Sequence, residues 1–328
     1  MFRRSALVLA ALLVLPSPGA SAFDCNKAMT PSETVICADP AALKADVAMG
    51  EAYSALLAHA PAPERAEIEA AQMQWLQRRD NACSAVEGAS RGECLTRESD
   101  QRRGFLTGLP EAGPGTPGRI APHFRIEKGG PGRAALDIEL LKFVDTDTAA
   151  ARAFNEAVEK LTSDIVEPEK GEPQADHYAY DWHMRLTYAS PRLISARLDG
   201  YAYTGGAHPN MFTRNVNIDV AEGREARFDD AFTPQAAEKV FAFCDQSVRE
   251  QKKQKLGDDA PKSADDLATL AREVRDATRD FSAWSFGADA ATIVYDAYAV
   301  GAYYEGAYAC EIPYAKLREL AKPGFPLP

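Results

Sequence analysis

The chain has 328 residues, enough for two domains with hydrophobic cores, and a formal net charge of −11 from 37 basic and 48 acidic side chains. This acidic balance disfavours a nucleic-acid partner, because phosphate binding needs clustered lysine and arginine. It favours instead the electrostatic attraction of a basic partner.

The first residues have the features of a secretory signal peptide. Two arginines precede an apolar run over 6–15, and small residues at 20–22 form a cleavage site. The run is too short to be a permanent membrane anchor. We therefore expect residues 1–22 to be removed by a cut after Ala22, which takes the net charge from −11 to −13. The mature protein is expected to be periplasmic or secreted, without a membrane span.

Six cysteines, an even number in an exported chain, predict disulfide bonds. They are Cys25, Cys37, Cys83, Cys94, Cys244 and Cys310. Four lie in the N-terminal part and two much later, so we expect two bridges near the N-terminus and one between Cys244 and Cys310. Neither a CxxC nor a CxxH pair occurs, which disfavours a metal site at these cysteines.

The N-terminal part has apolar residues at helical spacing. The predicted helices cover 39–58, 63–83 and 94–109. Asp39 is suited to cap the first helix and Pro40 to occupy its first turn.

The expected packing of these helices suggests a pairing of the first four cysteines. Two helices joined by a short loop pack antiparallel, which brings Cys37 at the start of the first helix near Cys83 at the end of the second. We therefore expect a Cys37–Cys83 bridge and, with it, Cys25–Cys94. In so small a helical unit each bridge contributes roughly 2–4 kcal/mol.

Residues 108–118, GLPEAGPGTPG, hold four glycines and three prolines without apolar periodicity and predict a linker. Beyond it strands and helices are mixed. The predicted strands are 134–144, 178–188, 192–204, 212–220, 281–286, 291–295 and 308–312, and the predicted helices are 148–165, 233–255, 264–277 and 313–320. Strands in runs indicate an α+β fold with a largely antiparallel sheet. The expected organisation is a signal peptide at 1–22, a disulfide-stapled all-α module at 23–109, a Pro/Gly linker at 110–118 and an α+β domain at 119–328.

The stretch YAYTGGAHPN, residues 201–210, predicts a turn between two strands, because alternating patterns flank it and its glycines accept positive φ. The residues of this candidate binding loop are Tyr203, Gly205, Gly206, His208 and Asn210. In one interpretation His208 and Asn210 only hydrogen-bond to the backbone of the turn. In another, the loop contacts a partner.

A third interpretation makes His208 catalytic, which requires an orienting carboxylate and a nucleophile or a metal. The candidate carboxylates are Asp199, Asp219, Asp296 and Glu305, and the candidate metal ligands are His177 and His183. The two histidines are six residues apart and have no H-E-x-x-H context. The sequence therefore favours binding over catalysis, and we assign no catalytic residue, metal or cofactor.

Aromatic and charged residues elsewhere each have a structural and a binding interpretation. The segment VYDAYAVGAYYEGAYA, 294–309, contains tyrosines that suit either an interface or the core face of a sheet, namely Tyr295, Tyr298, Tyr303, Tyr304 and Tyr308. We expect Trp75 to pack in a helical core. Arg78 and Arg79, with Asp80, form either a surface ion cluster or an internal tie.

The N-terminal module resembles a known family. The residues that carry the resemblance are Phe23-Asp24-Cys25, Glu33, Ile36-Cys37, Asp39, Leu43, Asp46, Tyr53, Gln72, Trp75-Leu76, Arg79-Asp80, Cys83 and Cys94-Leu95. In this order, with the patterns E-x-x-I-C and W-L-x-x-R-D-x-C, they are similar to the LprI-like module over 23–109. That module is named for a secreted lysozyme inhibitor.

The second part resembles the extracellular domain shared by the anti-sigma factor RsiV and the deacetylase PdaC (DUF3298/DUF4163-like), over 119–321. The residues that carry this resemblance are 203–210, Asn217, Asp219, Gly223, Phe286-Gly287, Tyr298, Val300, Gly306, Ile312-Pro313 and Leu317. In RsiV the domain is implicated in recognising lysozyme. The two resemblances together imply a binding protein that recognises lysozyme or a related cell-wall hydrolase and inhibits it. The alternatives are a non-inhibitory envelope or peptidoglycan-binding module, and a hydrolase that uses His208.

Overall fold

The computed structural model describes residues 25–168 and 177–328, so the predicted signal peptide lies outside the described residues. The helices are α1 (Pro31–Ala38), α2 (Pro40–His59), α3 (Ala62–Ser84), α4 (Ala89–Thr107), α5 (Ala149–Leu161), α6 (Phe228–Ala231), α7 (Pro234–Leu256), α8 (Ala264–Arg279) and α9 (Tyr314–Leu320). The strands are β1 (Arg119–Glu127), β2 (Ala135–Val144), β3 (Ala179–Ala189), β4 (Leu193–Tyr203), β5 (Asn210–Asp219), β6 (Arg224–Glu225), β7 (Trp284–Phe286), β8 (Ala290–Tyr295) and β9 (Tyr308–Pro313). Single 3-10 turns are η1 (Cys25–Lys27), η2 (Thr162–Asp164), η4 (Gly257–Asp259), η5 (Phe281–Ala283) and η6 (Tyr303–Glu305).

Side-chain caps fix the first helices. A capping box begins α1, in which the Thr30 hydroxyl accepts from the Glu33 amide and the Glu33 carboxylate accepts from the Thr30 amide. The Asp39 side chain caps α2 as predicted, accepting from the amides of Ala41 and Ala42. Asp39 also lies so close to Gly92 of α4 that a Cβ at this glycine would come within 2.2 Å of the Asp39 carboxylate. A side chain at residue 92 would therefore displace the Asp39 carboxylate that caps α2.

The cysteine pairing expected in the helical unit is wrong. The bridges are Cys25–Cys37 and Cys83–Cys94, each between residues whose Cα atoms are 5.7 Å apart. The missed helix α1 turns the chain back so that Cys37 meets Cys25, and the short α3–α4 connection places Cys94 beside Cys83. The expected approach of the region around Cys37 to the end of α3 is nevertheless observed: Ile36 lies in one small hydrophobic cluster with Cys83 and Cys94. The third bridge, Cys244–Cys310, is confirmed.

The α+β fold class is confirmed, with two sheets in the part of the chain that the structure describes. One sheet has the strand order β1-β2-β3-β4-β5-β6, with antiparallel neighbours except for the parallel pair β2–β3, which α5 connects. The other is antiparallel, in the order β7-β8-β9. The strand β1 was not predicted; Pro122 argues against a central strand, and β1 is indeed at the edge of its sheet.

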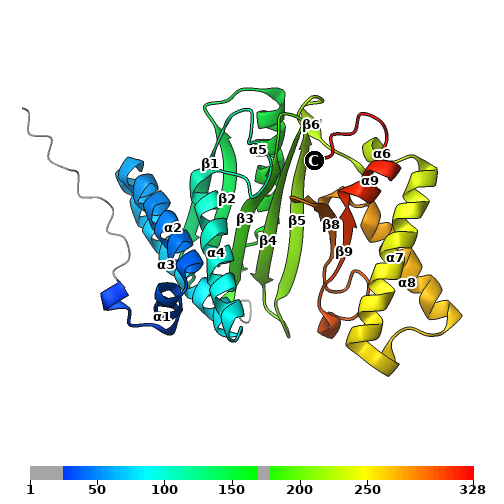
Figure 1. Ribbon diagram of the computed structural model, residues 1–328, viewed down its shortest axis with the longest axis horizontal. Helices are drawn as coiled ribbons and strands as arrows, with labels where there is room; N and C mark the ends of the chain where they lie inside the picture. The colour runs from blue at the N-terminus through cyan, green and yellow to red at the C-terminus, as the bar shows by residue number, and fades with distance from the viewer. Residues whose placement is uncertain (1–24, 169–176) are drawn as a thin grey trace, which may run out of the picture.

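In the helical unit α1–α4, the helices α2, α3 and α4 share one hydrophobic core with the six-stranded sheet. Met49, Trp75 and Phe105 from the helices are buried in the same cluster as Ile138 of β2 and Trp182 of β3. Figure 1 shows this unit at one end of the molecule, beside β1 to β3. The helices α3 and α4 therefore cover part of the sheet, and one of the two candidate sites lies between them and the strands.

The Pro/Gly-rich segment between the helices and β1 is held against β3. The Glu111 amide donates to the Leu186 carbonyl at 2.8 Å, the Ala189 amide to Ala112 at 3.1 Å, and the Gly115 amide to Ala189 at 3.1 Å. These bonds fix how the helices and the sheet lie relative to each other. The domain boundaries given above stay a prediction.

The second core lies at the other end of the molecule (Figure 1). There α7, α8 and α9 pack on the three-stranded sheet around the buried rings of Trp284 and Phe286. The Cys244–Cys310 bridge joins α7 to β9 inside this core. Among the described helices, none is both long and apolar enough to cross a membrane.

Candidate functional sites

The predicted turn lies against the tyrosine-rich segment, although about ninety residues separate them in sequence. Strands β4 and β5 pair as far as Ala202 opposite Asn210, so residues 203–209 form the turn between them, here called the His208 turn. Gly205 and Gly206 have φ of 84° and 98°, which glycine accepts without strain. Residues 296–307, between β8 and β9, are here called the tyrosine loop.

His208 joins these two segments. Its ring stacks on Tyr303, with centroids 3.6 Å apart and planes at 16°. Its Nδ1 lies 3.0 Å from the Pro209 carbonyl and its Nε2 3.1 Å from the Tyr298 hydroxyl. Since a carbonyl only accepts, we assign the proton to Nδ1, and the Tyr298 hydroxyl then donates to Nε2. Tyr303 completes the junction by donating from its hydroxyl to the Pro209 carbonyl at 2.8 Å.

The other residues of the candidate loop shape the turn. The Tyr203 hydroxyl donates to the Gly206 carbonyl at 3.1 Å, and Asn210 is exposed at the start of β5. Whether these residues contact a partner stays a prediction.

Large apolar side chains gather in the open next to His208. Met211 is 66% exposed, Tyr298 61% and Tyr304 77%, and we call these three residues the tyrosine patch. Tyr298 has φ of 72°, a conformation rare for a bulky residue, so the surrounding contacts hold it there at a cost of order 1–3 kcal/mol. A cavity of about 590 Å³ opens beside the patch, between Met211 and the rings of Tyr303 and Tyr304.

A buried carboxylate anchors the tyrosine loop from behind. Glu305 forms an ion pair with Lys252 of α7. Its carboxylate also accepts a 2.7 Å hydrogen bond from the Tyr308 hydroxyl and a 2.8 Å hydrogen bond from the Ala302 amide. Lys255 donates to the Glu305 carbonyl. Although burial raises the pKa of Glu305, the hydrogen bonds from Lys252 and Tyr308 hold it below its ordinary value of 4.5.

The four carboxylates considered as partners of His208 are all engaged elsewhere. Asp296 accepts from the Thr213 amide at 3.0 Å and pairs with Arg214. Asp199 pairs with Arg197 on its own strand. Asp219 accepts from two backbone amides in the turn after β5, and Glu305 is the anchor described above. No hydrogen bond or ion pair links His208 to any of them within residues 25–168 and 177–328.

The tyrosines of the tyrosine-rich segment divide between the core and the surface. Tyr295 and Tyr308 are buried in the second core, whereas Tyr298 and Tyr304 are exposed. Trp75 is buried as expected. Arg79 is an internal tie, bonded to Asp46 of α2 at 2.7 Å and to Asp80 at 3.2 Å.

Two short matches to catalytic motifs lack the structural context of those motifs. GASRG, 88–92, fits G-x-S-x-G, but it joins α3 to α4 rather than a strand to a helix. GPGTPG, 113–118, fits the dinucleotide fingerprint, but it follows a helix and precedes β1.

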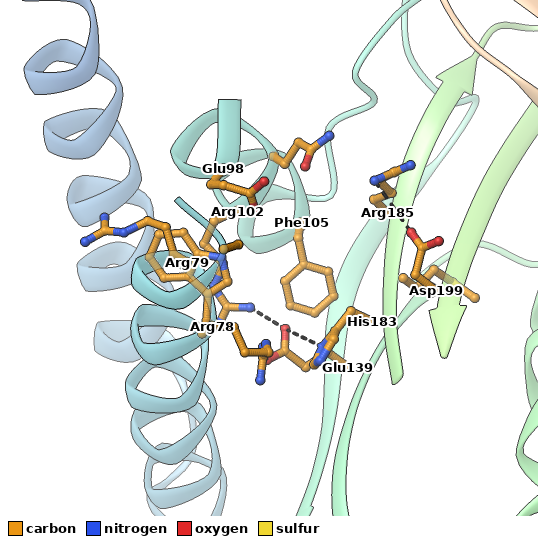
Figure 2. Close-up of a pocket in the computed structure, with 13 residues that line it drawn as sticks. Arg78, Arg79, Glu98, Arg102, Phe105, Glu139, His183, Arg185 and Asp199 are labelled. Carbon is orange, nitrogen blue, oxygen red and sulfur yellow. Dashed lines mark hydrogen bonds and ion pairs between the residues drawn. The ribbon is translucent and has the colours of Figure 1, made fainter. Parts of the chain in front are cut away.

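A second site, the junction pocket, lies where α3 and α4 cover the sheet (Figure 2). Its volume is about 250 Å³. Its walls are Trp75, Arg78, Arg79, Ala82, Glu98, Gln101, Arg102, Phe105, Glu139, His183, Met184, Arg185 and Asp199. Asp199 also lines the cavity beside the tyrosine patch, so both cavities reach this residue of β4.

The floor of the junction pocket is a buried ion network. Arg102 of α4 pairs with Glu139 of β2, and both side chains are almost fully buried. Arg78 of α3 bridges Glu139, at 3.0 Å, and Asp137. Burial raises the pKa of Asp137 to about 6, although Arg78 acts to lower it. Opposite charges therefore tie the helical unit to β2.

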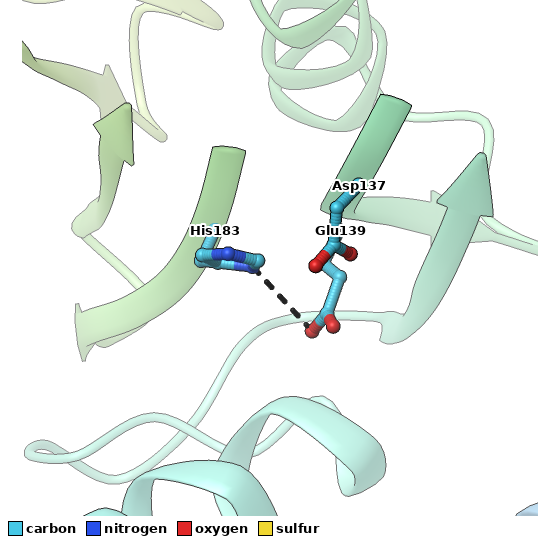
Figure 3. Close-up of side chains that lie close together, drawn as sticks. All are labelled: Asp137, Glu139 and His183. Atoms are coloured by element: carbon cyan, nitrogen blue, oxygen red, sulfur yellow. Dashed lines mark ion pairs between the residues drawn. The ribbon is translucent and has the colours of Figure 1, made fainter. Parts of the chain in front are cut away.

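Asp137, Glu139 and His183 bring their potential ligand atoms within 4.8 Å of one another (Figure 3). The guanidinium groups of Arg78 and Arg102 already occupy the carboxylate oxygens that a cation would need. The Nε2 atom of His183 is bonded to Asp181. This cluster fits an ion-pair network better than a metal site. His177, the other histidine considered, is not a member of it.

The sequence interpretation did not identify the junction pocket. Its residues come from α3, α4 and strands β2 to β4, so only the tertiary fold brings them together. One signal was present: Asp137 and Glu139 occupy alternate positions of a strand whose other face carries Leu136, Ile138 and Leu140. Such alternation is also typical of a strand face exposed to solvent, so it did not by itself predict the arginines that cover this face.

Comparisons with known proteins confirm both resemblances. Residues 25–106 match the family model described as lysozyme inhibitor LprI, residues 134–211 that of deacetylase PdaC, and residues 229–315 that of a protein of unknown function (DUF3298). No curated protein matches the chain. A DUF3298 structure from Bacteroides fragilis is similar at 16% identity over 62% of this chain and 93% of that one, with a TM-score of 0.45. A DUF3298 family protein from Pseudomonas aeruginosa is similar at 19% identity over 64% and 94%, with a TM-score of 0.37.

Proposed function

We propose that this protein acts outside the cytoplasm as a binding protein that recognises lysozyme or a related cell-wall hydrolase and blocks it, with the tyrosine patch as the main contact. The match to the lysozyme inhibitor model over 25–106 supports the class of partner. Three disulfide bonds fit an oxidising compartment. The observation that carries the choice of surface is the exposed cluster of Met211, Tyr298 and Tyr304.

The tyrosine patch has the chemistry of a binding hot spot. Tyrosine and methionine are enriched at interfaces, where a tyrosine ring supplies contact area and its hydroxyl a polar handle. The stacked ring of Tyr303 and the buried anchor Glu305 hold the patch in place before any partner arrives. Less conformational entropy is then lost on binding, which raises affinity.

The net charge of the protein supports a basic partner. An acidic molecule attracts a cationic protein at long range and speeds their encounter, an effect that salt screens. We expect the association rate to fall with ionic strength, and the dissociation rate to depend mainly on the tyrosine patch.

The geometry around His208 supports binding rather than turnover. Both ring nitrogens are engaged, one with the backbone of the turn and one with a tyrosine. A general base needs a ring nitrogen within reach of a substrate proton. We propose that His208 orders the tyrosine patch and has no catalytic role.

A lysis assay tests this proposal. Mature protein is added to several lysozymes acting on cell walls, and the decrease in turbidity is followed. We expect the protein to slow lysis at near-stoichiometric ratios to lysozyme, and we expect this inhibition to be weaker at high salt. Retention on insoluble peptidoglycan without any slowing of lysis would replace the proposal with a peptidoglycan-binding function. A hydrolytic activity of the protein itself, lost in a folded His208→Ala variant, would replace it with an enzyme.

A further inference from the structure

The junction pocket carries an inference that is independent of the tyrosine patch. It is a cavity of about 250 Å³, below the roughly 300–1,000 Å³ of pockets for drug-sized ligands. Figure 2 shows Arg102 and Phe105 on the helical side and Arg185 and Asp199 on the strand side. Any occupant is therefore small and lies between the helices and the sheet.

Two buried guanidinium atoms of residues that line this pocket have no hydrogen bond among the described residues, namely Nη2 of Arg102 and Nε of Arg185. Nδ1 of His183 also has none, but it lies 3.9 Å from the Glu139 carboxylate, and because Nε2 bonds to Asp181 it is not counted here as a donor. Arg102 is only 3% exposed. Its Nε atom donates to Gln72 and its Nη1 atom to Glu139, so Nη2 is the guanidinium nitrogen without a hydrogen bond.

Arg185 is held loosely on the opposite wall. Its charged partners Glu111 and Asp199 lie at 3.4 and 3.6 Å, longer than normal hydrogen bonds to a guanidinium. A buried donor without a partner is unfavourable, and native proteins supply such groups with water, an ion or a ligand. Since a guanidinium only donates, the missing partner must offer acceptor oxygens.

The walls also restrict the charge and shape of a ligand. Four arginines and three carboxylates line the pocket, and Asp137, Asp46 and Asp80 pair with Arg78 and Arg79. Little positive charge is left over, which disfavours a doubly charged phosphate relative to a singly charged anion. The Arg102 guanidinium lies 5.5 Å from the Trp75 ring centroid and 5.2 Å from that of Phe105. An anionic group bonded to Arg102 therefore has aromatic surface beside it for an apolar body.

We propose that the junction pocket binds a small monocarboxylate, whose oxygens accept from Arg102 and Arg185 and whose apolar body lies beside Trp75 and Phe105. Because these residues belong to the helices and to the sheet, the ligand joins the two parts of the fold. Binding therefore raises the unfolding temperature of the whole chain.

Benzoate and acetate are the probes that test this proposal, with neutral benzamide as the matched control for benzoate. Calorimetric titration of the mature, disulfide-bonded protein is expected to show saturable binding of benzoate and none of benzamide. Trp75 faces the pocket while Trp182 and Trp284 are in the cores, so tryptophan fluorescence should change with benzoate. In Trp75→Phe the fluorescence change should be absent while the calorimetric signal remains.

Two variants locate the anion. Arg185→Gln, at a partly exposed position, is expected to weaken benzoate binding by about tenfold or more through loss of a charged hydrogen bond. Arg102→Gln combined with Glu139→Gln removes both charges of the buried pair, so that neither is left unpaired, and should abolish binding in a folded protein. Arg275→Gln, in an exposed pair with Glu238 far from the pocket, is the control and should bind as the unmodified protein does.

Three results would overturn the proposal. One is the absence of saturable binding by both acetate and benzoate. Another is benzamide binding as tightly as benzoate, since the site would then not select an anion. The third is full affinity in both Arg185→Gln and the folded double variant, which would place the carboxylate elsewhere on the protein.

Discussion

Among single residues, His208 joins two segments of the chain that are about ninety residues apart in sequence. The histidine stacks on one tyrosine of the tyrosine loop and accepts from another. The sequence identified the turn and the tyrosines separately, but it gave no signal that they meet, because their contact depends on how β5 packs beside the second sheet.

His208→Ala is expected to lower the free energy of unfolding by about 1–2 kcal/mol, since a stacked ring pair and a side-chain hydrogen bond are lost. Binding of the hydrolase should weaken by more than this loss of stability explains, because Tyr298 is no longer held. Urea unfolding measures the first effect and titration with lysozyme the second. A variant that binds normally would show that the patch does not depend on His208.

The buried pair of Arg102 and Glu139 has a larger expected effect. Arg102→Ala leaves the Glu139 carboxylate buried without its main partner and should lower the free energy of unfolding by about 3–5 kcal/mol. Arg275→Ala, in the exposed pair with Glu238, should cost about 1 kcal/mol or less. Urea unfolding of the two variants gives the comparison, and equal losses would contradict the assignment of Arg102 to a buried network.

At the scale of elements, the tyrosine loop depends on Glu305. The folded-state pKa of this carboxyl lies below the unfolded value of 4.5, so its contribution to stability is present above pH 4.5 and is lost as pH falls through the folded pKa. Glu305→Gln should therefore be clearly less stable than the unmodified protein at pH 7, and this gap should close in acid. Unfolding curves of both proteins at several pH values measure the gap. A gap that stays constant would mean that the carboxylate is not the stabilising species.

The disulfide bonds differ in the length of chain that they close. Cys83–Cys94 joins residues 11 apart and Cys244–Cys310 residues 66 apart, and all four cysteines are buried. In the chain-entropy model the first contributes about 3 kcal/mol and the second about 4 kcal/mol. Replacing each pair with serines and measuring unfolding by urea should show the larger loss for the Cys244–Cys310 pair. The opposite order would show that strain or residual structure outweighs loop length.

Much of the element order could be predicted, because apolar periodicity and caps are local signals. The α5, α7 and α8 helices and strands β2 to β5 lie within a few residues of their predicted ranges. The α1 helix was missed although Thr30 and Glu33 have the spacing of a capping box. The cysteine pairing was wrong because it was inferred from helices without this one. The junction pocket had no local signal beyond two acids on one strand.

At the scale of the whole molecule, the helical unit and the sheet form one packed body. Buried residues of α2, α3 and α4 belong to the same core as β2 and β3, and the Pro/Gly segment is bonded along β3. The tyrosine patch and the junction pocket therefore lie on one framework, and Asp199 of β4 lines both the pocket and the cavity beside the patch. This arrangement favours binding that needs little reorganisation of the protein.

Binding of lysozyme through the tyrosine patch is tested most directly by a calorimetric titration of a lysozyme with the mature protein and with the Tyr298→Ala/Tyr304→Ala double variant. The exposed Met73→Ala variant, on α3, serves as the control. We expect one-to-one binding by the unmodified and control proteins, and at least about a hundredfold weaker binding by the double variant, equivalent to about 3 kcal/mol. Undiminished binding by the double variant, or no binding of any lysozyme by the unmodified protein, would contradict this proposal.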